Sequence, residues 1–477
     1  MQTSRDMETK NETARFLEEN FNTFIEDLKT LVRIPSVSFP DFPEAELTRS
    51  AEAVASLLRA RGLENVRILK IPGAPPYVVG ERIHAPGKPT LLLYAHHDVQ
   101  PPGREELWES PPFEPTQKEG PGGMRLYGRG CADDKAGIIV HTSAIASYLR
   151  TLGELPVNVK VVIEGEEEVG SAHLEQFLKA YRDELDADIL VLTDTTNFDC
   201  GVPALTVALR GMVGLEVEVR ALSKTVHSGM WGGPLPDPAI ALSKILGTLL
   251  DKNGHIAVPG VMDQVRPVSP KEKAEFSRIP YDEAEFRNQS GLIPGAKIFE
   301  TEVSPLIQTW RLPSLTVNAI QASSRHQAGN IINDAAWAKI TVRLVADMDG
   351  EKVLEQLKKH LQSQVPWGLE IKFTHESSSP PWSTSTEDQA FVAAEKALSK
   401  GYGRAPYKIG CGGSIPFVKP FAEALGGAPA LLIGVEDPYT NAHGENESLL
   451  IQDLKSACLS QIYLFAELAE TWKKKRG

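Results

Sequence analysis

The sequence has few cysteines and no long apolar run, and both absences narrow the class of protein. Its 477 residues include four cysteines, Cys131, Cys200, Cys411 and Cys458, and none forms a CxxC pair. Neither a disulfide framework nor a thiolate metal site is therefore expected. No segment approaches the roughly 18 apolar residues of a membrane-spanning helix, and the N-terminal segment has no apolar signal core. These features predict a protein of the reducing cytoplasm that does not enter a membrane.

The chain also lacks an excess of positive charge. Its 50 Lys and Arg residues face 63 Asp and Glu residues, which gives a formal net charge of -13 at pH 7. This balance argues against a nucleic acid or an anionic membrane as partner. Hydrophobic residues make up 42% and charged residues 24%, as in soluble globular proteins, and the length suits two domains.

Strand-like and helix-like segments alternate in the first third of the chain. Buried strands are predicted at residues 90–95, 157–163 and 187–193. Strands separated by helices of this length predict an α/β fold, with a mostly parallel sheet and helices on both faces. The helices are predicted at residues 12–33, 50–61, 135–149 and 171–185.

The pattern changes near Leu205, where polar and apolar residues begin to alternate. This alternation, repeated at 336–345, is typical of antiparallel strands with one solvated face. A helix is predicted at 238–252, whereas residues 255–312 show little periodicity. The linker-like stretch SSSPPWSTST then leads back to an α/β pattern. We therefore predict a catalytic domain formed by residues 1–204 and 381–477, with an inserted α+β lid or dimerisation domain at 205–380.

Strand 90–95 runs directly into His96, His97 and Asp98. Side chains alternate between faces along an extended segment, so His96 and Asp98 share a face and His97 points away. A metal-bound histidine needs an acceptor for its second ring nitrogen, and a carboxylate provides one. We interpret His96 as a metal ligand and Asp98 as its orienting partner. The alternative is a pair of polar residues at the end of a strand.

Other acidic or histidine clusters lie in turns and after strands. Asp133 follows a glycine-containing turn, where it can cap a helix or bridge two cations. The glutamates of 164–168 end a buried strand, and such like charges are costly unless a cation neutralises them. Asp194 follows strand 187–193, and His443 lies in a loop after another strand. A solvated loop is the alternative for the glutamates, and an exposed loop residue for His443.

Taken together, these clusters indicate a metal site. Ligands of open α/β sheets bind outside the carboxyl ends of the strands, so the clusters are expected to converge. Nitrogen and carboxylate ligands without thiolates suit Zn²⁺, with Mn²⁺ or Co²⁺ as substitutes. Two metals bridged by one carboxylate activate water and polarise a carbonyl group, while a free glutamate can act as general base.

The motifs resemble those of the zinc metallopeptidase family of carboxypeptidase G, aminoacylase, succinyl-diaminopimelate desuccinylase and carnosinase. The segments YAHHDVQPP, LYGRGCADDK, VHSGMWGG, WRLPSLTV and GCGGSIPF resemble the cytosolic non-specific dipeptidase and carnosinase branch of that family. The similarity extends over nearly the whole chain. It implies a two-zinc hydrolase that cleaves dipeptides with a free carboxylate and forms a homodimer through the lid.

The resemblance also implies a set of metal ligands. His96 and Asp194 would hold one zinc ion, and Glu168 and His443 would hold the other. Asp133 would bridge the two ions.

Roles in catalysis and substrate binding follow from the same resemblance. Glu167 would be the general base, and Asp98 would orient the first histidine ligand. His227 would stabilise the oxyanion in the active site of the other subunit. Arg343 would pair with the substrate carboxylate in a bidentate geometry. Further substrate contacts would come from Asn330, Gly412, Gly413 and Ser414.

Two positions depart from the family pattern. Asn333 follows Ile332 where the family often has an Ile-Pro pair, and His97 stands where an apolar residue is usual. The runner-up function is an amidohydrolase acting on N-acyl amino acids, which needs the same metals and base. A binding protein without metal is a third alternative, but all five ligand positions and Glu167 are intact, which argues against it.

Overall fold

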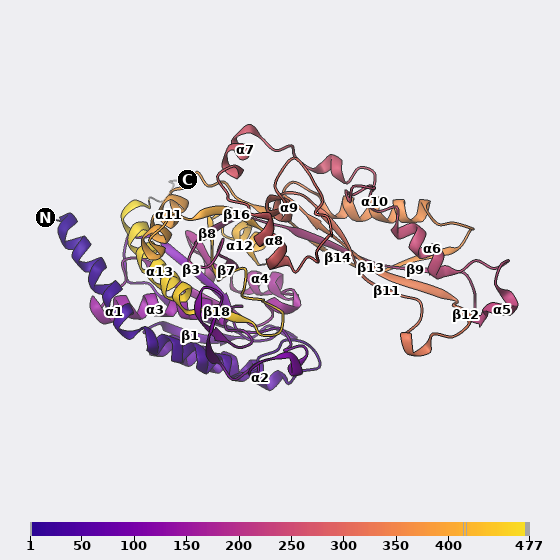
Figure 1. The fold of residues 1–477 in the computed structure, drawn as a ribbon. Coiled ribbons are helices and arrows are strands. Elements are labelled where there is room, and N and C mark those ends of the chain that lie inside the picture. The colour runs from indigo at the N-terminus through magenta and orange to yellow at the C-terminus, as the bar shows by residue number, and fades with distance from the viewer. Residues whose placement is uncertain (1, 414, 416, 473–477) are drawn as a thin grey trace. The chain divides into compact units, whose positions relative to one another are not determined.

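The computed structural model describes residues 2–413, 415 and 417–472 (Figure 1). The chain divides into two compact units. Unit 1 comprises Met1–Val207, Thr384–Ile409 and Ile415–Gly477, and unit 2 comprises Ala208–Ser383 and Gly410–Ser414. The boundaries expected after residues 204 and 380 thus lie three residues before those of the units. Segment 410–414, expected in the catalytic domain, groups with unit 2 because the backbone N–H of Arg210 contacts the carbonyls of Cys411 and Gly413.

The centre of unit 1 is a sheet whose four middle strands run parallel. In order across the sheet these are β6 (Asn158–Glu164), β3 (Thr90–His96), β7 (Ile189–Thr196) and β17 (Ala430–Glu436). Their side chains are almost entirely buried, as expected for strands covered on both faces. The strands that flank these four are antiparallel, and those on the side of β6 were not predicted from the sequence. The flanking antiparallel strands are β1 (Glu64–Leu69) and β2 (Tyr77–Arg82) on one side and β8 (Ala204–Leu209) on the other.

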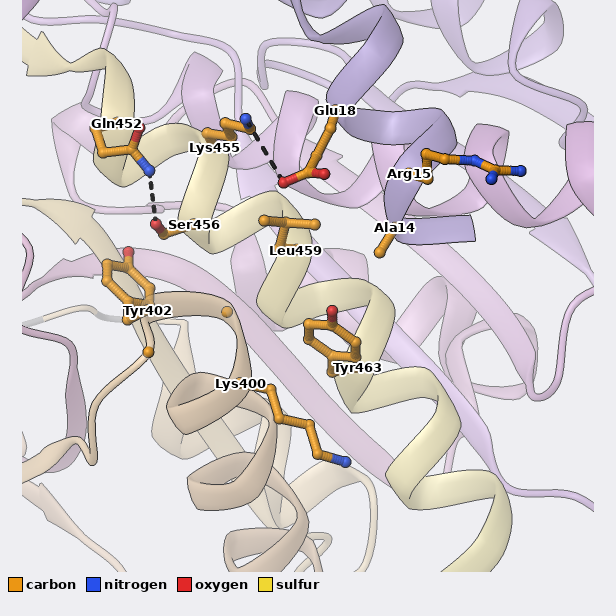
Figure 2. A pocket seen from close by; sticks show the side chains of 12 residues that line it. Ala14, Arg15, Glu18, Lys400, Tyr402, Gln452, Lys455, Ser456, Leu459 and Tyr463 are labelled. Atoms are coloured by element: carbon orange, nitrogen blue, oxygen red, sulfur yellow. Dashed lines mark hydrogen bonds and ion pairs between the residues drawn. The ribbon is translucent and has the colours of Figure 1, made fainter. Parts of the chain in front are cut away.

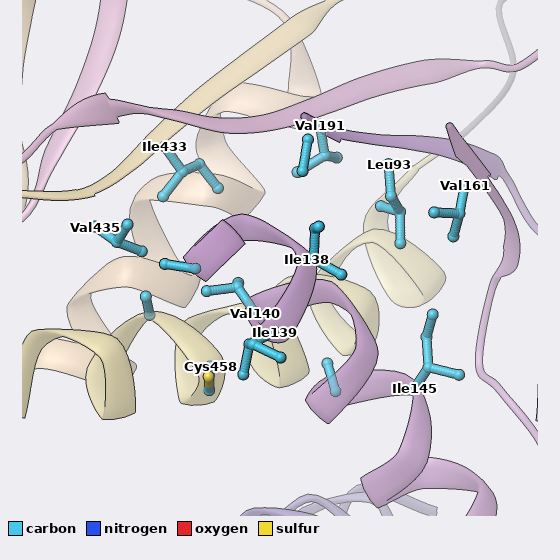
Figure 3. Packing of buried hydrophobic residues seen from close by; sticks show 14 of the residues in the cluster. Leu93, Ile138, Ile139, Val140, Ile145, Val161, Val191, Ile433, Val435 and Cys458 are labelled. Carbon is cyan, nitrogen blue, oxygen red and sulfur yellow. The ribbon is translucent and has the colours of Figure 1, made fainter. Parts of the chain in front are cut away.

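Helices cover both faces of this sheet, which confirms the predicted fold class. On one face, strand residues such as Leu93, Val161 and Val191 pack against Ile138 and the other apolar residues of the helices (Figure 3). The helices of that cluster are α1 (Gln2–Val32), α2 (Glu44–Ala60), α3 (Lys135–Thr151), α11 (Gln389–Tyr402) and α13 (Ile451–Thr471).

The opposite face is covered by α4 (Leu174–Leu185) and α12 (Val418–Ala424), which contact each other. Aromatic residues of the strands stack on this layer: the ring centroids of Tyr94 and Phe417 are 3.7 Å apart, and those of Tyr77 and Phe177 are 4.0 Å apart. Tyr94 follows Leu93 in β3, so the alternation of faces assigns one residue to each helical layer. A smaller sheet contains β4 (Thr116–Gly120), β5 (Gly123–Tyr127) and β18 (Ser448–Leu450).

Unit 2 contains a four-stranded antiparallel sheet, as the alternation predicted. The order is β11 (Ser314–Gln321), β13 (Ala335–Leu344), β9 (Gly211–Arg220) and β14 (Glu370–Ser379). Every second residue of β9 and β13 is buried against α6 (Pro238–Leu246) and α10 (Gly350–Ser363). Further elements of unit 2 are β10 (Val226–His227), α5 (Ser228–Trp231), β12 (Ile331–Ile332) and β15 (Trp382–Ser383), whereas β16 (Tyr407–Cys411) begins in unit 1 and has its last two residues in unit 2.

Several element boundaries differ from those expected. The first helix begins at Gln2 rather than near residue 12, and α6 ends at Leu246, before Gly247, rather than at 252. Segment 255–312, which shows little periodicity, forms short helices that begin with a capping Ser or Asp. These are α7 (Pro270–Phe276), α8 (Glu283–Ser290) and α9 (Pro305–Arg311). None of the described helices is both long and apolar enough to cross a bilayer.

A surface pocket of unit 1 lies among α1, α11 and α13 (Figure 2). Lys455 and Glu18 form an ion pair of 3.7 Å across it, and Tyr402 and Tyr463 line it. Next to this pocket, Gly401 brings α11 close to α13. A Cβ atom at Gly401 would lie 2.6 Å from the carbonyl oxygen of Ser456 and 2.7 Å from the backbone nitrogen of Ser460.

This close approach predicts that Gly401→Ala destabilises unit 1. The added methyl group meets backbone atoms that cannot move without separating the helices, so we expect a loss of about 1–3 kcal/mol in the free energy of unfolding. The measurement is urea-induced unfolding. Gly329→Ala is the matched control, because a Cβ atom there meets nothing within 4 Å. Equal unfolding midpoints for the two variants would contradict the prediction.

Candidate metal centre

Acidic residues and a histidine collect where the central strands of unit 1 end. His96 is the last residue of β3, Glu164 the last of β6 and Glu436 the last of β17, while Asp194 lies near the end of β7. The four strands are parallel neighbours, so their carboxyl ends meet at one edge of the sheet. This edge is where ligands bind in open α/β sheets, as the sequence analysis assumed.

The buried ring of His96 faces three carboxylates. Its Nε2 atom lies 3.1 Å from Asp133 Oδ1, 3.9 Å from Asp194 Oδ2 and 4.0 Å from Glu167 Oε2. Its Nδ1 atom lies 3.0 Å from the carbonyl oxygen of Asp98 and 3.5 Å from the Oδ1 of the same residue. Nε2 is therefore the atom available to a metal, while Asp98 fixes the ring.

A second group of potential ligands surrounds His443. Its Nε2 atom lies 3.0 Å from Asp133 Oδ2 and 3.2 Å from Glu168 Oε2. Hydrogen bonds to these two carboxylates raise the pKa of His443 to about 11. Asp133 thus directs one oxygen toward each histidine, which is the arrangement required of a bridging ligand. Burial raises the pKa of Asp133, but hydrogen bonds with His443 and His96 outweigh it and lower the pKa.

The neighbouring Asp134 has a different role in the fold. Its carboxylate accepts hydrogen bonds from the backbone N–H of Gly137, as the N-cap of α3, and from that of His96. The capping alternative weighed for Asp133 therefore applies to the following residue. A Cβ atom at Gly137 would overlap Thr193 and this carboxylate, so the first turn of α3 requires a glycine there.

Asp98 also organises the glutamate segment. Its carboxylate accepts hydrogen bonds from the backbone N–H groups of Glu167 and Glu168, at 3.2 and 3.0 Å, and from the hydroxyl of Ser38 at 2.7 Å. These contacts fix the short 3₁₀ helix Glu167–Val169 next to His96. Asp98 therefore positions both the histidine and the two glutamates.

The adjacent carboxylates of Glu166 and Glu167 have different surroundings. Glu166 accepts a hydrogen bond from the hydroxyl of Tyr77 at 2.7 Å, and it pairs with His173 Nδ1 at 2.8 Å. Glu167 instead faces His96. Burial, together with the charges of Glu168 and other carboxylates, raises the pKa of Glu167 well above its usual value. A carboxylate with a raised pKa is suited to accept a proton near neutral pH.

Glu447 is a buried residue beside the site that was not predicted from the sequence. Its buried carboxylate accepts hydrogen bonds from the backbone N–H groups of Gly130, Ala132 and Asp133, at 2.9 to 3.2 Å. It also forms a 2.7 Å ion pair with Arg129. Glu447 therefore holds the turn that presents Asp133. Its position four residues after His443 was the available signal, but nothing in the sequence indicates which turn it contacts.

These side chains fit a pair of metal ions. Three groups have ligand atoms that all lie within 4.8 Å of one another: His96, Asp134 and Asp194; Asp133, Glu168 and His443; and Asp133, Asp194 and Glu436. The donors are imidazole nitrogens and carboxylate oxygens, which suit Zn²⁺, Mn²⁺ or Co²⁺. All five predicted ligands belong to these groups.

His97 does not belong to any of these groups. It is buried, and its Nε2 atom lies 2.9 Å from the carbonyl oxygen of Pro76. Burial lowers the pKa of His97 to about 4.

Within unit 2, Arg210 connects the strand partner of Arg343 with the segment that contains Gly412 and Gly413. Arg343, on β13, pairs with Ser314 of β11, and Ser314 Oγ accepts a hydrogen bond from the guanidinium of Arg210. Arg210 also donates to the carbonyl oxygen of Gly412 at 3.0 Å. Burial and the charge of Arg343 lower the pKa of Arg210 to about 10. Among the described residues, no carboxylate pairs with either guanidinium. Arg210, a second cation beside the predicted carboxylate-binding residue, was not predicted.

The position of the Arg210 guanidinium explains why residue 412 of the predicted GGS segment is a glycine. A Cβ atom at Gly412 would lie 2.9 Å from the guanidinium of Arg210 and 3.0 Å from the carbonyl oxygen of Thr309. Gly413 accepts a hydrogen bond from the backbone N–H of Arg210. The third residue of the segment, Ser414, lies outside the described residues.

His227 and Asn330 lie together at the other end of β13. His227 pairs with Ile331 across the two-stranded sheet β10–β12, and the backbone N–H of Ser228 donates to the carbonyl oxygen of Asn330. Both residues are exposed. The strand rise of about 3.3 Å per residue puts roughly 26 Å between Arg343 and the start of β13 near them. Within unit 2, Asn330 is thus separated from Arg343, with which it was grouped as a substrate contact. Asn333 lies in the turn between β12 and β13.

Comparison with known proteins identifies the family. The sequence profile described as Peptidase family M20/M25/M40 matches residues 92–467. Beta-Ala-His dipeptidase of Rattus norvegicus is 30% identical over 455 residues, which cover 91% of this chain and 90% of the relative. Cysteinylglycine-S-conjugate dipeptidase of Corynebacterium striatum is 30% identical over 415 residues, covering 86% and 88%. The structure of human carnosine dipeptidase 1 is similar with a TM-score of 0.85 at 29% identity, covering 97% of this chain and 99% of that chain.

The fold, the buried cluster and these matches define the class of protein as a metallopeptidase. The chain belongs to Peptidase family M20/M25/M40. The resemblance noted from the sequence motifs, including that to the carnosinase and dipeptidase branch, is confirmed.

The contacts of Glu447 predict that Glu447→Gln weakens metal binding. An amide cannot accept hydrogen bonds on both sides, so the turn around Asp133 loses part of its support and Arg129 loses its charged partner. Residues that support metal ligands in this way typically contribute about 10–100-fold in affinity. The measurement is zinc content after dialysis against buffered free Zn²⁺. Glu445→Gln is the matched control, because Glu445 lies in the same loop but pairs with exposed Arg104. Wild-type zinc content in Glu447→Gln would contradict the prediction.

Proposed function

We propose that this protein is a dipeptidase with two zinc ions, which hydrolyses the amide bond next to a free C-terminal carboxylate. The observation that carries the proposal is the position of Asp133, with one oxygen toward His96 and the other toward His443, beside Glu167. The names of the relatives, Beta-Ala-His dipeptidase and Cysteinylglycine-S-conjugate dipeptidase, support a dipeptide as substrate. We further propose the reducing cytoplasm as its compartment, consistent with the four free cysteines.

The proposed metal ligands are those of the two histidine groups. His96 and Asp194 hold one ion, His443 and Glu168 hold the other, and Asp133 bridges them. The ions, when bound, supply a Lewis acid for the scissile carbonyl and make water a stronger acid; Mn²⁺ or Co²⁺ can substitute for zinc. The protein residues then have three tasks: to hold the substrate, to move the proton and to support the negative charge on the carbonyl oxygen.

Glu167 moves the proton in the proposed mechanism. Its carboxylate takes a proton from the attacking water and delivers it to the nitrogen of the leaving amine. Asp98 supports this step by holding the backbone of Glu167 and the ring of His96. Arg343 holds the carboxylate of the substrate through its guanidinium, with Arg210 adding positive charge at the same place and the backbone of Gly412 and Gly413 lining the loop. Ser414 is proposed as a further contact.

His227 and Asn330 are proposed to act in the active site of a second copy. Both lie at the exposed end of unit 2, with Met230 77% exposed and Trp231 50% exposed beside them. The edge strand β11 is also exposed along its second half, including Ile320. Exposed apolar residues and an uncovered sheet edge favour pairing between copies, and two-fold dimers are the commonest assemblies. A homodimer through unit 2 would bury these residues and carry His227 to the oxyanion of its partner.

The role of Glu167 predicts a large loss of activity in Glu167→Gln. The amide keeps the shape of the side chain but cannot accept the proton, so turnover of a dipeptide should fall at least about 100-fold while zinc content is retained. Glu166→Gln is the matched control, because the adjacent glutamate is directed to Tyr77 and His173. Near-normal turnover in Glu167→Gln with full zinc content would exclude the proposed base.

The role of Arg343 predicts how the enzyme responds to amidated substrates. Amidation removes the negative charge that the guanidinium binds, so it should lower kcat/KM strongly in the wild type and much less in Arg343→Ala. The measurement compares a dipeptide, its C-terminal amide and its N-acetyl derivative with both enzymes. Equal effects of amidation on both would show that Arg343 does not bind the carboxylate. Faster hydrolysis of N-acyl amino acids than of any free dipeptide would favour the amidohydrolase function instead.

The proposed sharing of active sites predicts complementation between two inactive variants. Glu167→Gln and His227→Ala chains should each be nearly inactive alone. After random exchange, half of the dimers are mixed, and each mixed dimer has one site with an intact Glu167 and an intact His227 from the other chain. Activity should therefore recover to about a quarter of the wild-type value. The measurement follows dipeptide hydrolysis after subunit exchange, with exchange monitored by two affinity tags. No recovery despite exchange would rule out a role for His227 in the partner's site.

A further inference from the structure

Two carboxylates of the three ligand groups lie outside the set of ligands proposed above: Asp134, which caps α3, and Glu436. Glu436 is the last residue of β17, and it pairs in register with Thr196 of β7, two residues beyond Asp194. A carboxylate oxygen of Glu436 lies within 4.8 Å of oxygens of Asp133 and Asp194, and those two are within 4.8 Å of each other. Glu436 is therefore close enough to share an ion with two of the proposed ligands.

The side chain of Glu436 differs from the supporting carboxylates nearby in having no hydrogen-bond donor. Glu447 has three backbone N–H groups and Arg129, and Asp437 has the guanidinium of Arg125 at 2.8 Å. No described residue donates a hydrogen bond to the side chain of Glu436; only its backbone carbonyl accepts one, from Asn197. Glu436 is half-buried, and nearby carboxylates repel its charge unless a cation balances it.

We propose that Glu436 is a further ligand of the ion held by His96 and Asp194. That ion would have one nitrogen ligand and three carboxylates, those of Asp133, Asp194 and Glu436. The other ion would have one nitrogen and two carboxylates. This inference rests on the proposed two-metal function and extends it to the preference for particular metals.

The added carboxylate makes the two positions chemically unequal. Mn²⁺ is a harder cation than Zn²⁺ and prefers oxygen ligands and higher coordination numbers, whereas zinc is satisfied by four ligands that include nitrogen. The metal position next to His96 and Glu436 should therefore favour Mn²⁺ more strongly than the metal position next to His443. Removal of Glu436 should lower the affinity for Mn²⁺ more than the affinity for Zn²⁺, and at only one of the two positions.

The test is metal binding to metal-free protein, without an activity assay. Binding of Mn²⁺ is followed by electron paramagnetic resonance and binding of Zn²⁺ by equilibrium dialysis, for the wild type, Glu436→Gln and the control Glu445→Gln. We expect two ions in the wild type and in the control. In Glu436→Gln we expect at least about a tenfold loss of Mn²⁺ affinity at one position and a smaller loss for Zn²⁺. Wild-type isotherms for both metals in Glu436→Gln would overturn the proposal for Glu436 and leave the two-metal function intact.

Thermal unfolding distinguishes a role of Glu436 as a metal ligand from a role in stabilising the fold. Because Glu436 adds a negative charge to a cluster of carboxylates, metal-free Glu436→Gln should unfold at the same temperature as the metal-free wild type or higher. The increase in Tm on adding Mn²⁺ should be smaller for the variant, since it binds this ion more weakly. A lower Tm for the metal-free variant would assign Glu436 a structural role and overturn the proposal. Failure of the folded wild type to bind two ions would instead overturn the two-metal function itself.

Discussion

The repulsion among carboxylates at the carboxyl edge of the central sheet is the constraint on which the rest of unit 1 depends. Parallel strands β3, β6, β7 and β17 bring their ends to one edge, and these ends carry acidic residues at high density. Burial in a medium of low dielectric makes this repulsion stronger than it would be in water. Burial accordingly raises the pKa of Asp194 well above its usual value. The edge requires positive charge, and the two histidines provide only part of it.

The pattern of hydrogen-bond donors divides these acidic residues into two groups. Asp98, Asp134 and Glu447 accept hydrogen bonds from backbone N–H groups, and they hold the turns and helix ends that surround the site. A second group faces the histidines: Asp194 has no such donor among the described residues, whereas Glu168 also accepts hydrogen bonds from the backbone N–H and the side-chain amide of Gln100. The backbone donors provide rigidity, and the oxygens that face the histidines are available to cations; Glu168 combines both features. This division follows from the local backbone, because strand ends and helix starts supply N–H groups at some positions and not at others.

The sequence predicted the parts of this structure that depend on local pattern. Continuous apolar runs identified the central strands, and the alternation of side chains correctly placed His97 away from the site. Alternation also identified β9 and β13. The edge strands β1 and β2 were missed because their half-exposed residues give a weak pattern, and the helices of 255–312 because each has only seven or eight residues. Arg210, Glu436 and Glu447 were not predicted for another reason. Their surroundings are formed by segments that are far apart in the chain, and no local sequence pattern indicates such contacts.

The insertion of unit 2 in the sequence of unit 1 has a consequence for synthesis of the protein. Strand β17 lies between β7 and β8, and α13 packs on α1 and α3, so the N-terminal segment cannot complete its sheet until the C-terminal segment exists. After Val207 another 229 residues (436 − 207) must be translated before β17 is complete at Glu436. At about 5–20 residues per second this takes roughly 11–46 s, during which the edge of β7 that pairs with β17 is uncovered. The nascent chain therefore exposes this strand edge for the whole of that time, whereas the entire sequence of unit 2, which ends at Ser414, precedes β17.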